Sequence, residues 1–136
     1  MDTEQHDPVT VTGEPVTVTA ELATRFAEAV GSPAPGPDGT DLPVTLAAAL
    51  TADVQRAVMA HPELRIDLSR TLHTAQSSRH LRPIRVGETL VATSTVTTVR
   101  PARGGRMISF DTVLADAAGA PVQVSSTSLL TAGAGS

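Results

Sequence analysis

The sequence has no cysteine, no tryptophan, no tyrosine and only two phenylalanines. Without cysteine the chain has no disulfide, no thiolate zinc site and no cysteine nucleophile. Its formal net charge of −4 and its shortage of aromatic rings leave neither the basic field nor the stacking surfaces that nucleic-acid binding usually needs. We therefore expect no bound metal, no cofactor and no nucleic-acid partner.

The chain also lacks long apolar runs. No uninterrupted apolar stretch approaches the roughly 18 residues that span a bilayer, and the start, Met-Asp-Thr-Glu, is acidic where a secretory signal is basic. These features predict a cytoplasmic protein with no membrane association. With 136 residues, 40% of them hydrophobic, the composition fits one globular domain. We expect a flexible N-terminus over 1–8, a single domain over 9–131 and a flexible tail over 132–136.

The first part of the chain predicts two helices separated by a loop. Thr19 has the side chain of an N-cap, and the apolar residues after it recur at helical spacing until Gly31. Residues 32–41 hold three prolines and two glycines, which predicts a loop. In the second helix apolar side chains return at strict four-residue spacing, at Leu42, Leu46, Leu50, Val54 and Val58.

After the second helix the apolar residues change from a helical to a strand period. Three β-rich stretches occupy 71–82, 87–100 and 106–131, and the last is broken by a turn. Arg103–Gly105 and Asp116–Gly119 supply residues that tolerate positive φ, which predicts two hairpins. A long buried helix against an antiparallel sheet is an α+β design.

A group of short motifs carries a family resemblance. His73-x-x-Gln76 is followed by His80, by Pro83 and by Gly87-Glu88, and the stretch Phe26-Ala-Glu-Ala-Val-Gly precedes the proline-rich loop. In this order the motifs resemble those of the MaoC-like dehydratase family, and the similarity extends to about residue 131. The resemblance implies a hot-dog fold, in which an antiparallel sheet wraps a long central helix. It also implies that two such domains pair edge to edge, which removes an exposed strand edge.

The loop that holds the catalytic residues of the family is degenerate in this chain. Catalytic members read Asp-x-Asn-Pro-x-His there, and the Asp and His share the proton transfers of dehydration. Here Ser32, Ala34 and Pro37 stand at the Asp, Asn and His positions. None of these side chains acts as an acid or a base near neutral pH. A repositioned Asp38 or Asp41 is the alternative source of a carboxylate, but the loop has no histidine.

The resemblance, together with this loss, implies a subunit that does not catalyse on its own. Some family members pair one hot dog that holds the Asp and His with a second that lacks them and shapes the acyl tunnel. We therefore expect a non-catalytic, tunnel-forming subunit of a heterodimeric (3R)-hydroxyacyl thioester dehydratase, a lyase. Its expected partners are a catalytic MaoC-like subunit and a substrate carried by acyl carrier protein or coenzyme A, in fatty-acid or polyketide biosynthesis. The acyl chain length, the kind of carrier and the identity of the partner stay open.

Five residues are candidates for binding the substrate. Leu46 and Leu50 belong to the helix edge that lines the acyl tunnel in this fold, and the others come from the motif around His73. Because side chains alternate along a strand, His73 and His80 should lie on opposite faces, with Gln76 on the face of His80. We expect His80 and Gln76 to be able to pair on that face.

A row of arginines offers positive charge for the phosphate of a pantetheine arm or for an acidic carrier protein. An ordinary solvated surface is the alternative. The predicted contacts are Arg79, Arg82 and Arg85, extended into one patch by Arg100, Arg103 and Arg106 on the next hairpin.

Two rival functions remain open. In an autonomous hot-dog thioesterase, a helix carboxylate such as Asp53 would activate water against the thioester. Alternatively, the chain forms a non-enzymatic homodimer that binds acyl groups.

Overall fold

The computed structural model describes residues 9–31 and 46–132. In these residues a six-stranded antiparallel sheet has the strand order β1-β4-β5-β6-β3, and β2 pairs separately with β4. No helix in the described residues is long and apolar enough to cross a membrane. The elements are β1 (Thr10–Thr12), β2 (Val16–Thr17), α1 (Ala20–Val30), α2 (Leu46–Met59), the 3-10 turn η1 (Leu68–Arg70), β3 (Thr71–His80), β4 (Thr89–Ala102), β5 (Gly105–Ala115) and β6 (Pro121–Ala132).

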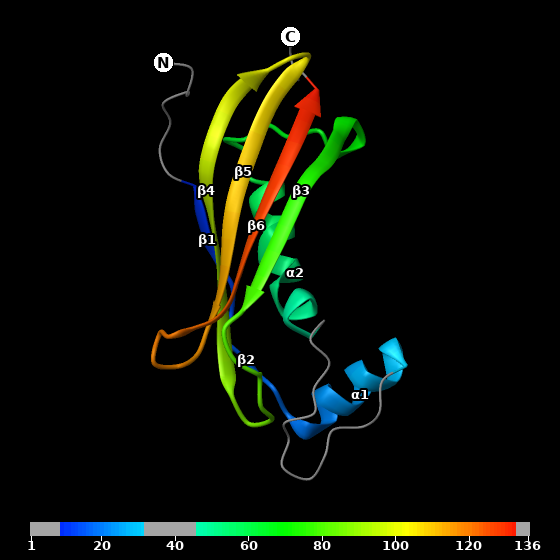
Figure 1. The fold of residues 1–136 in the computed structure, drawn as a ribbon, viewed down its shortest axis with the longest axis vertical. Helices are drawn as coiled ribbons and strands as arrows, with labels where there is room; N and C mark the ends of the chain where they lie inside the picture. The colour runs from blue at the N-terminus through cyan, green and yellow to red at the C-terminus, as the bar shows by residue number, and fades with distance from the viewer. Residues whose placement is uncertain (1–8, 32–45, 133–136) are drawn as a thin grey trace.

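The long helix α2 lies against one face of the sheet and runs along its strands, whereas α1 lies beyond one end of the sheet (Figure 1). We call the face that carries α2 the inner face. The opposite face is the outer face. β3 forms one edge of the sheet, and β1 lies at the other. The predicted α+β class is confirmed.

The caps of α1 are those that the sequence predicts. The Thr19 hydroxyl accepts a hydrogen bond from the backbone N–H of Leu22 at 3.0 Å, and Gly31 ends the helix in the left-handed conformation at φ 74°. α2 confirms the predicted second helix from Leu46 onward. Leu42 and the proline-rich loop lie outside the described residues.

Both predicted hairpins are confirmed. The β4–β5 turn contains Gly104 at φ 78°, and the β5–β6 turn contains Gly119 at φ 86°. Gly105 is needed for a different reason, because a Cβ added there would come within 1.9 Å of the carbonyl oxygen of Thr131 on β6. The 3-10 turn η1 was not predicted. Asp67 caps it, with its carboxylate accepting a hydrogen bond from the backbone N–H of Ser69 at 3.0 Å.

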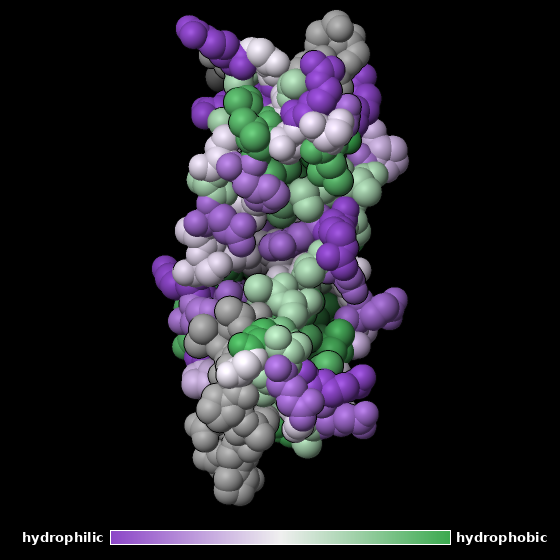
Figure 2. Space-filling model, turned by 90° about the vertical axis from the view of Figure 1, so that its right-hand side faces the viewer, coloured by the Kyte–Doolittle hydropathy of each residue, from purple (hydrophilic) through white to green (hydrophobic). Residues whose placement is uncertain are grey.

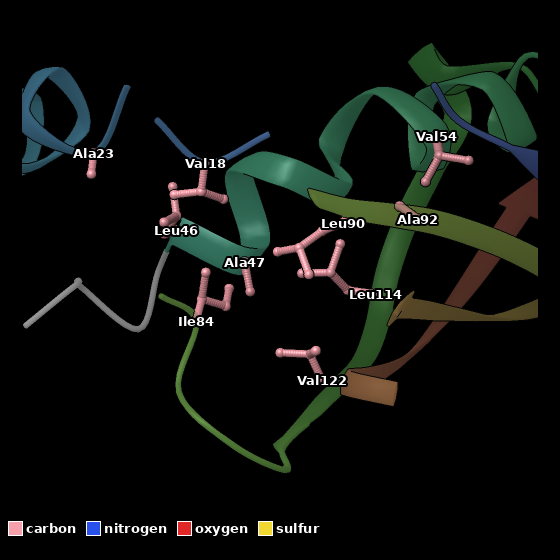
Figure 3. Packing of buried hydrophobic residues seen from close by; sticks show 10 residues of the cluster. All are labelled: Val18, Ala23, Leu46, Ala47, Val54, Ile84, Leu90, Ala92, Leu114 and Val122. Carbon is pink, nitrogen blue, oxygen red and sulfur yellow. The ribbon is translucent and has the colours of Figure 1, made fainter. Parts of the chain in front are cut away.

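The apolar core consists of two clusters under α2. The first lies at the N-terminal end of the helix, where Leu46 and Ala47 meet side chains from β4 and β5 (Figure 3). The second lies near the C-terminal end of α2 and includes Phe110. Buried members of the first are Val18, Ala23, Leu46, Ala47, Val54, Ile84, Leu90, Ala92, Leu114 and Val122, and those of the second are Val9, Val58, Leu64, Val96, Val99, Ile108, Phe110 and Leu129.

A row of hydroxyl groups crosses the inner face between the two clusters. Ser94, Thr112 and Ser125 lie opposite one another on β4, β5 and β6, and all three are buried. The Ser94 and Thr112 hydroxyls hydrogen-bond at 2.6 Å. From α2, Gln55 donates to the Thr112 hydroxyl at 3.3 Å. These bonds satisfy polar groups that would otherwise be costly to bury.

Replacing one hydroxyl of this row should destabilise the protein more than replacing two. Thr112→Val keeps the shape of the side chain but leaves the Ser94 hydroxyl without its buried partner, which should cost about 1–3 kcal/mol of unfolding free energy. The double variant Ser94→Ala/Thr112→Val removes both groups and should recover part of that loss. Urea unfolding of the three proteins measures the difference. Additive losses in the double variant would contradict this role.

Candidate functional site

The edge strand β3 is the most exposed strand of the sheet. It pairs with β6 on one side, and no other described strand pairs with it on the other side. Nine of its ten residues are exposed, so neither face of the strand is covered. Leu72 at its start and Leu81 just beyond its end are 66% and 41% exposed. Seen from this side, hydrophilic residues cross the middle of the surface between hydrophobic groups nearer its two ends (Figure 2).

A β-bulge corrects the predicted orientation of the two histidines of β3. The register with β6 shifts between His73 and Ala75, so that Thr74 is an extra residue in the strand. His73 lies opposite Leu129 and His80 lies opposite Gln123, and both partners are buried on the inner face. Because residues that lie opposite each other share a face, both histidines are on the inner face. The prediction of opposite faces was wrong because it counted alternation through the bulge.

The inner face of this edge is polar. The prediction that Gln76 and His80 share a face is confirmed, but the hydrogen-bonding partner of His80 is Gln123, at 3.4 Å between Nε2 atoms. Gln76 and His80 are four residues apart in an extended strand, about 13 Å, which is too far for a direct bond. The inner-face rows at the edge are Gln76 with Thr127, Ser78 with Ser125, and His80 with Gln123.

Residues of β6 form half of this polar surface, and the sequence alone did not single them out. Gln123, Ser125 and Thr127 alternate along the strand and are all buried. The alternation was visible in the sequence, but polar side chains at period 2 are also typical of a solvent-facing strand surface. Only the pairing with β3 places them beside the histidine and glutamine of the motif.

The two leucines predicted to bind substrate have different environments. Leu46 is 1% exposed and belongs to the first core cluster. Leu50 is only partly buried and packs against the same cluster. Leu50 is therefore the more accessible of the two.

Arg82 is part of a structural ion cluster. Its guanidinium bonds both Glu88 oxygens, at 2.5 and 3.0 Å, and an Asp116 oxygen at 3.1 Å. Glu88 also accepts the backbone N–H of Arg85 at 2.7 Å, and Asp116 accepts the backbone N–H of Ala120 at 2.9 Å. The cluster thus joins the segment between β3 and β4 to the β5–β6 turn. The guanidinium of Arg82 is thus already paired within the protein, and its role as a carrier contact stays a prediction.

The hydrogen bonds of this cluster favour the ionised carboxylates. The pKa of Glu88 lies below its usual range, chiefly because of the hydrogen bond from Arg82. The pKa of Asp116 is also lowered, first by the backbone N–H of Ala120 and then by Arg82. The pKa of Arg82 is raised further above its usual range by the same two carboxylates.

The remaining arginines do not form one patch. Arg79 lies opposite Val124 of β6, whereas Arg106 lies opposite Thr131 of the same strand. Along β6 these two positions are seven residues apart, which is about 23 Å. Arg106 also holds the carbonyl oxygen of Leu64 at 2.7 Å. The prediction of a continuous six-arginine patch was therefore wrong, because the antiparallel register sends the two groups to opposite ends of the sheet.

Arg79 lies at a shallow surface pocket on the β3 edge. The Ser126 hydroxyl in this pocket donates to Asp111 of β5 at 2.7 Å. Arg79 and Arg85 are both exposed. The pocket is lined by Ser77, Ser78, Arg79, Val124 and Ser126.

Asp53 lies on the face of α2 that does not contact the sheet. Its side chain is 93% exposed, and its carboxylate accepts a hydrogen bond from Arg56. Among the described residues, no three His, Asp or Glu side chains gather to hold a metal ion. Ser32, Ala34 and Pro37, and the nearby Asp38 and Asp41, lie outside the described residues.

Comparison with known proteins decides the family. The model of the FAS1-like, dehydratase domain region matches residues 8–124. The chain belongs to the FAS1-like dehydratase family. Relatives of this dehydratase-like chain include the UPF0336 protein of Thermobifida fusca, 29% identical over 119 residues, which covers 79% of this chain and 78% of the relative. The UPF0336 protein of Streptomyces avermitilis is 31% identical over 116 residues, 77% of each chain.

Solved structures confirm the hot-dog fold of the chain. The C-terminally truncated HadBC (3R-hydroxyacyl-ACP dehydratase) complex from Mycobacterium tuberculosis superposes with a TM-score of 0.72 at 19% identity, over 94% of this chain and 98% of that chain. The (R)-hydratase from A. caviae involved in PHA biosynthesis has a TM-score of 0.57 at 15% identity, over 96% and 97% of the two chains. The predicted MaoC-like resemblance is confirmed.

The Arg82 cluster should stabilise the protein in a pH-dependent way. Because the folded protein lowers the pKa of Glu88 and of Asp116, the unfolded chain takes up protons first as the pH falls. The stabilisation is therefore complete above about pH 5, and it is lost as the pH drops through the folded pKa values. Glu88→Gln should lower the urea midpoint at pH 7, and the difference from wild type should shrink toward pH 3.

Glu21→Gln is the matched control for this experiment. Glu21 pairs with Arg25 at 3.7 Å on an exposed face of α1, and such pairs contribute little. The urea midpoint of the Glu21→Gln variant should stay close to that of the wild type at every pH. A Glu88→Gln difference that does not change with pH would contradict the assigned role.

Proposed function

We propose that this chain is the non-catalytic, tunnel-forming subunit of a heterodimeric (3R)-hydroxyacyl thioester dehydratase, a single hot-dog domain over residues 9–131. The observation that carries the proposal is the β3 edge, which pairs with no second strand among residues 9–31 and 46–132, in a chain whose loop has Ser32, Ala34 and Pro37 in place of the family's Asp, Asn and His. Such an edge accepts a strand from another protein by continuing the sheet. The missing acid and base would then come from that protein.

The residues of the inner face at this edge suit binding better than catalysis. Dehydration needs a base for the proton next to the thioester carbonyl and an acid for the departing hydroxyl. The inner-face side chains of β3 and β6 offer hydroxyl, amide and imidazole groups but no carboxylate. Gln76 and His80 have groups that hydrogen-bond a carbonyl or hydroxyl oxygen. We therefore assign them, with His73, to positioning the substrate.

The substrate would lie where the two subunits meet. A partner strand beside β3 would place the polar inner face of the β3 edge at the junction between the two subunits. Leu50 of α2 would then contribute the apolar part of the binding surface. The name of the similar HadBC complex refers to a 3R-hydroxyacyl group on acyl carrier protein, and one structure of the same fold contains coenzyme A. We propose the same class of thioester, in cytoplasmic fatty-acid or polyketide assembly. Arg85, which lies beyond the end of β3, would contact the phosphate of the pantetheine arm or an acidic carrier protein.

Activity should require the partner. The purified chain alone should not dehydrate a (3R)-hydroxyacyl thioester. Together with a hot-dog subunit that carries Asp-x-Asn-Pro-x-His, encoded beside it, the chain should form a 1:1 complex that does. A spectrophotometric assay of the enoyl thioester, with native mass spectrometry of the complex, measures both. Robust dehydration by the lone chain would refute the proposal.

If β3 positions the substrate, a substitution on its inner face should change the KM of the complex. In the complex, Gln76→Ala should raise KM about three- to tenfold, which corresponds to the loss of one hydrogen bond. The value of kcat should stay nearly unchanged, because a hydrogen bond that is equally strong in the ground state and the transition state contributes to substrate binding alone. Ser77→Ala is the matched control, since Ser77 neighbours Gln76 but lies opposite Ser126 on the outer face. Equal effects of the two substitutions would contradict the assignment.

A further inference from the structure

The segment that forms the free edge is positively charged in an acidic protein. Residues 68–87 contain four arginines and neither Asp nor Glu. The other residues of the chain hold six arginines against fourteen carboxylates, a net charge of −8, whereas the whole chain has −4. The charge of this edge is therefore opposite to that of the rest of the molecule.

Three arginines of this segment project from the edge region. Arg70, Arg79 and Arg85 are exposed, and no described carboxylate forms a salt bridge with them. The fourth, Arg82, is neutralised by Glu88 and Asp116.

The other carboxylates near the edge already have partners. Asp67 accepts hydrogen bonds from the backbone and side chain of Ser69, and Asp111 accepts one from the Ser126 hydroxyl at 2.7 Å. Both remain close enough to weaken the positive field of the edge. Neither lies on β3, where Arg79 is the one arginine and no residue is acidic.

This charge distribution disfavours pairing between two copies of the chain. In an antiparallel pair of two β3 strands, each strand would bring Arg79 to the interface, and neither would bring a carboxylate. Like charges on paired strands are destabilising. Opposite charges on a partner strand would instead be attracted and steered into place.

We propose that the β3 edge selects a partner whose edge strand carries carboxylate side chains and rejects a second copy of this chain. This inference rests on the proposed function for the existence of a partner, and it adds the chemistry by which that partner is recognised. Arg70 and Arg79 are the residues that discriminate. The exposed leucines at the two ends of the strand contribute apolar contact to either partner and do not discriminate.

A charge-reversed copy of the chain serves as the acidic-edged partner in a test. The variant Arg70→Glu/Arg79→Glu reverses one charge at the end of η1, directly before β3, and one charge on β3 itself. Analytical ultracentrifugation at about 50 mM NaCl should show wild type and variant each as monomers, and an equal mixture as a heterodimer at least about tenfold tighter than either self-association. Hydrogen exchange should slow at the β3 amides in the mixture alone, and added salt should weaken the heterodimer.

The control is Arg100→Glu/Arg103→Glu, which reverses two exposed charges at the β4–β5 hairpin, away from β3 in the strand order. Mixed with wild type, it should stay monomeric. A wild-type homodimer as tight as the mixture, or equal association by the control variant, would overturn the inference. Unchanged thermal melting of both variants establishes that they fold.

The result is independent of the dehydratase assay. If the wild type self-associates through β3 while a natural partner still restores dehydration, the charge inference fails and the proposed function stands. If the mixture forms a salt-sensitive heterodimer but no partner restores dehydration, the proposed function fails and the charge selectivity stands.

Discussion

Backbone hydrogen bonding at β3 is the constraint on which the structure and its proposed role depend. An edge strand satisfies one side of its peptide groups through its neighbour and leaves the other to water or to another strand. In this chain that strand is ten residues long and exposed on both faces. Leucines lie at its two ends, and it has no acidic side chain. Proteins commonly protect such edges, and here continuation of the sheet by a partner would do so.

The polar surface next to this edge begins inside the core. The hydroxyls of Ser94, Thr112 and Ser125 cross the inner face at one level, and Ser78 of β3 lies at the end of the same row. Beside it, His80 contacts Gln123. The inner face is thus apolar at the two core clusters and polar along this row and toward β3. Such a gradient suits an acyl thioester, whose chain is apolar and whose reacting end is polar.

The Gly87-Glu88 motif has a structural explanation in this fold. Glu88 orients Arg82, and Arg82 reaches Asp116 across the turn between β5 and β6. The segment after β3 is thereby fixed to a hairpin that is remote in sequence. The direction in which β3 leaves the sheet follows from these bonds, so residues outside the site help to hold its geometry.

The sequence by itself determined the helices, the hairpins and the α+β class, because caps, apolar periodicity and glycine turns are local signals. It also showed that Ser32, Ala34 and Pro37 are neither acidic nor basic residues, because this depends on residue identity alone. Only the tertiary structure decided that both histidines of β3 share a face, because a bulge forms through pairing with β6. Only the tertiary structure also showed that Arg82 pairs with Glu88 and Asp116, and that the arginines are divided between the two ends of the sheet. These features depend on contacts between residues far apart in the chain, which no local pattern encodes.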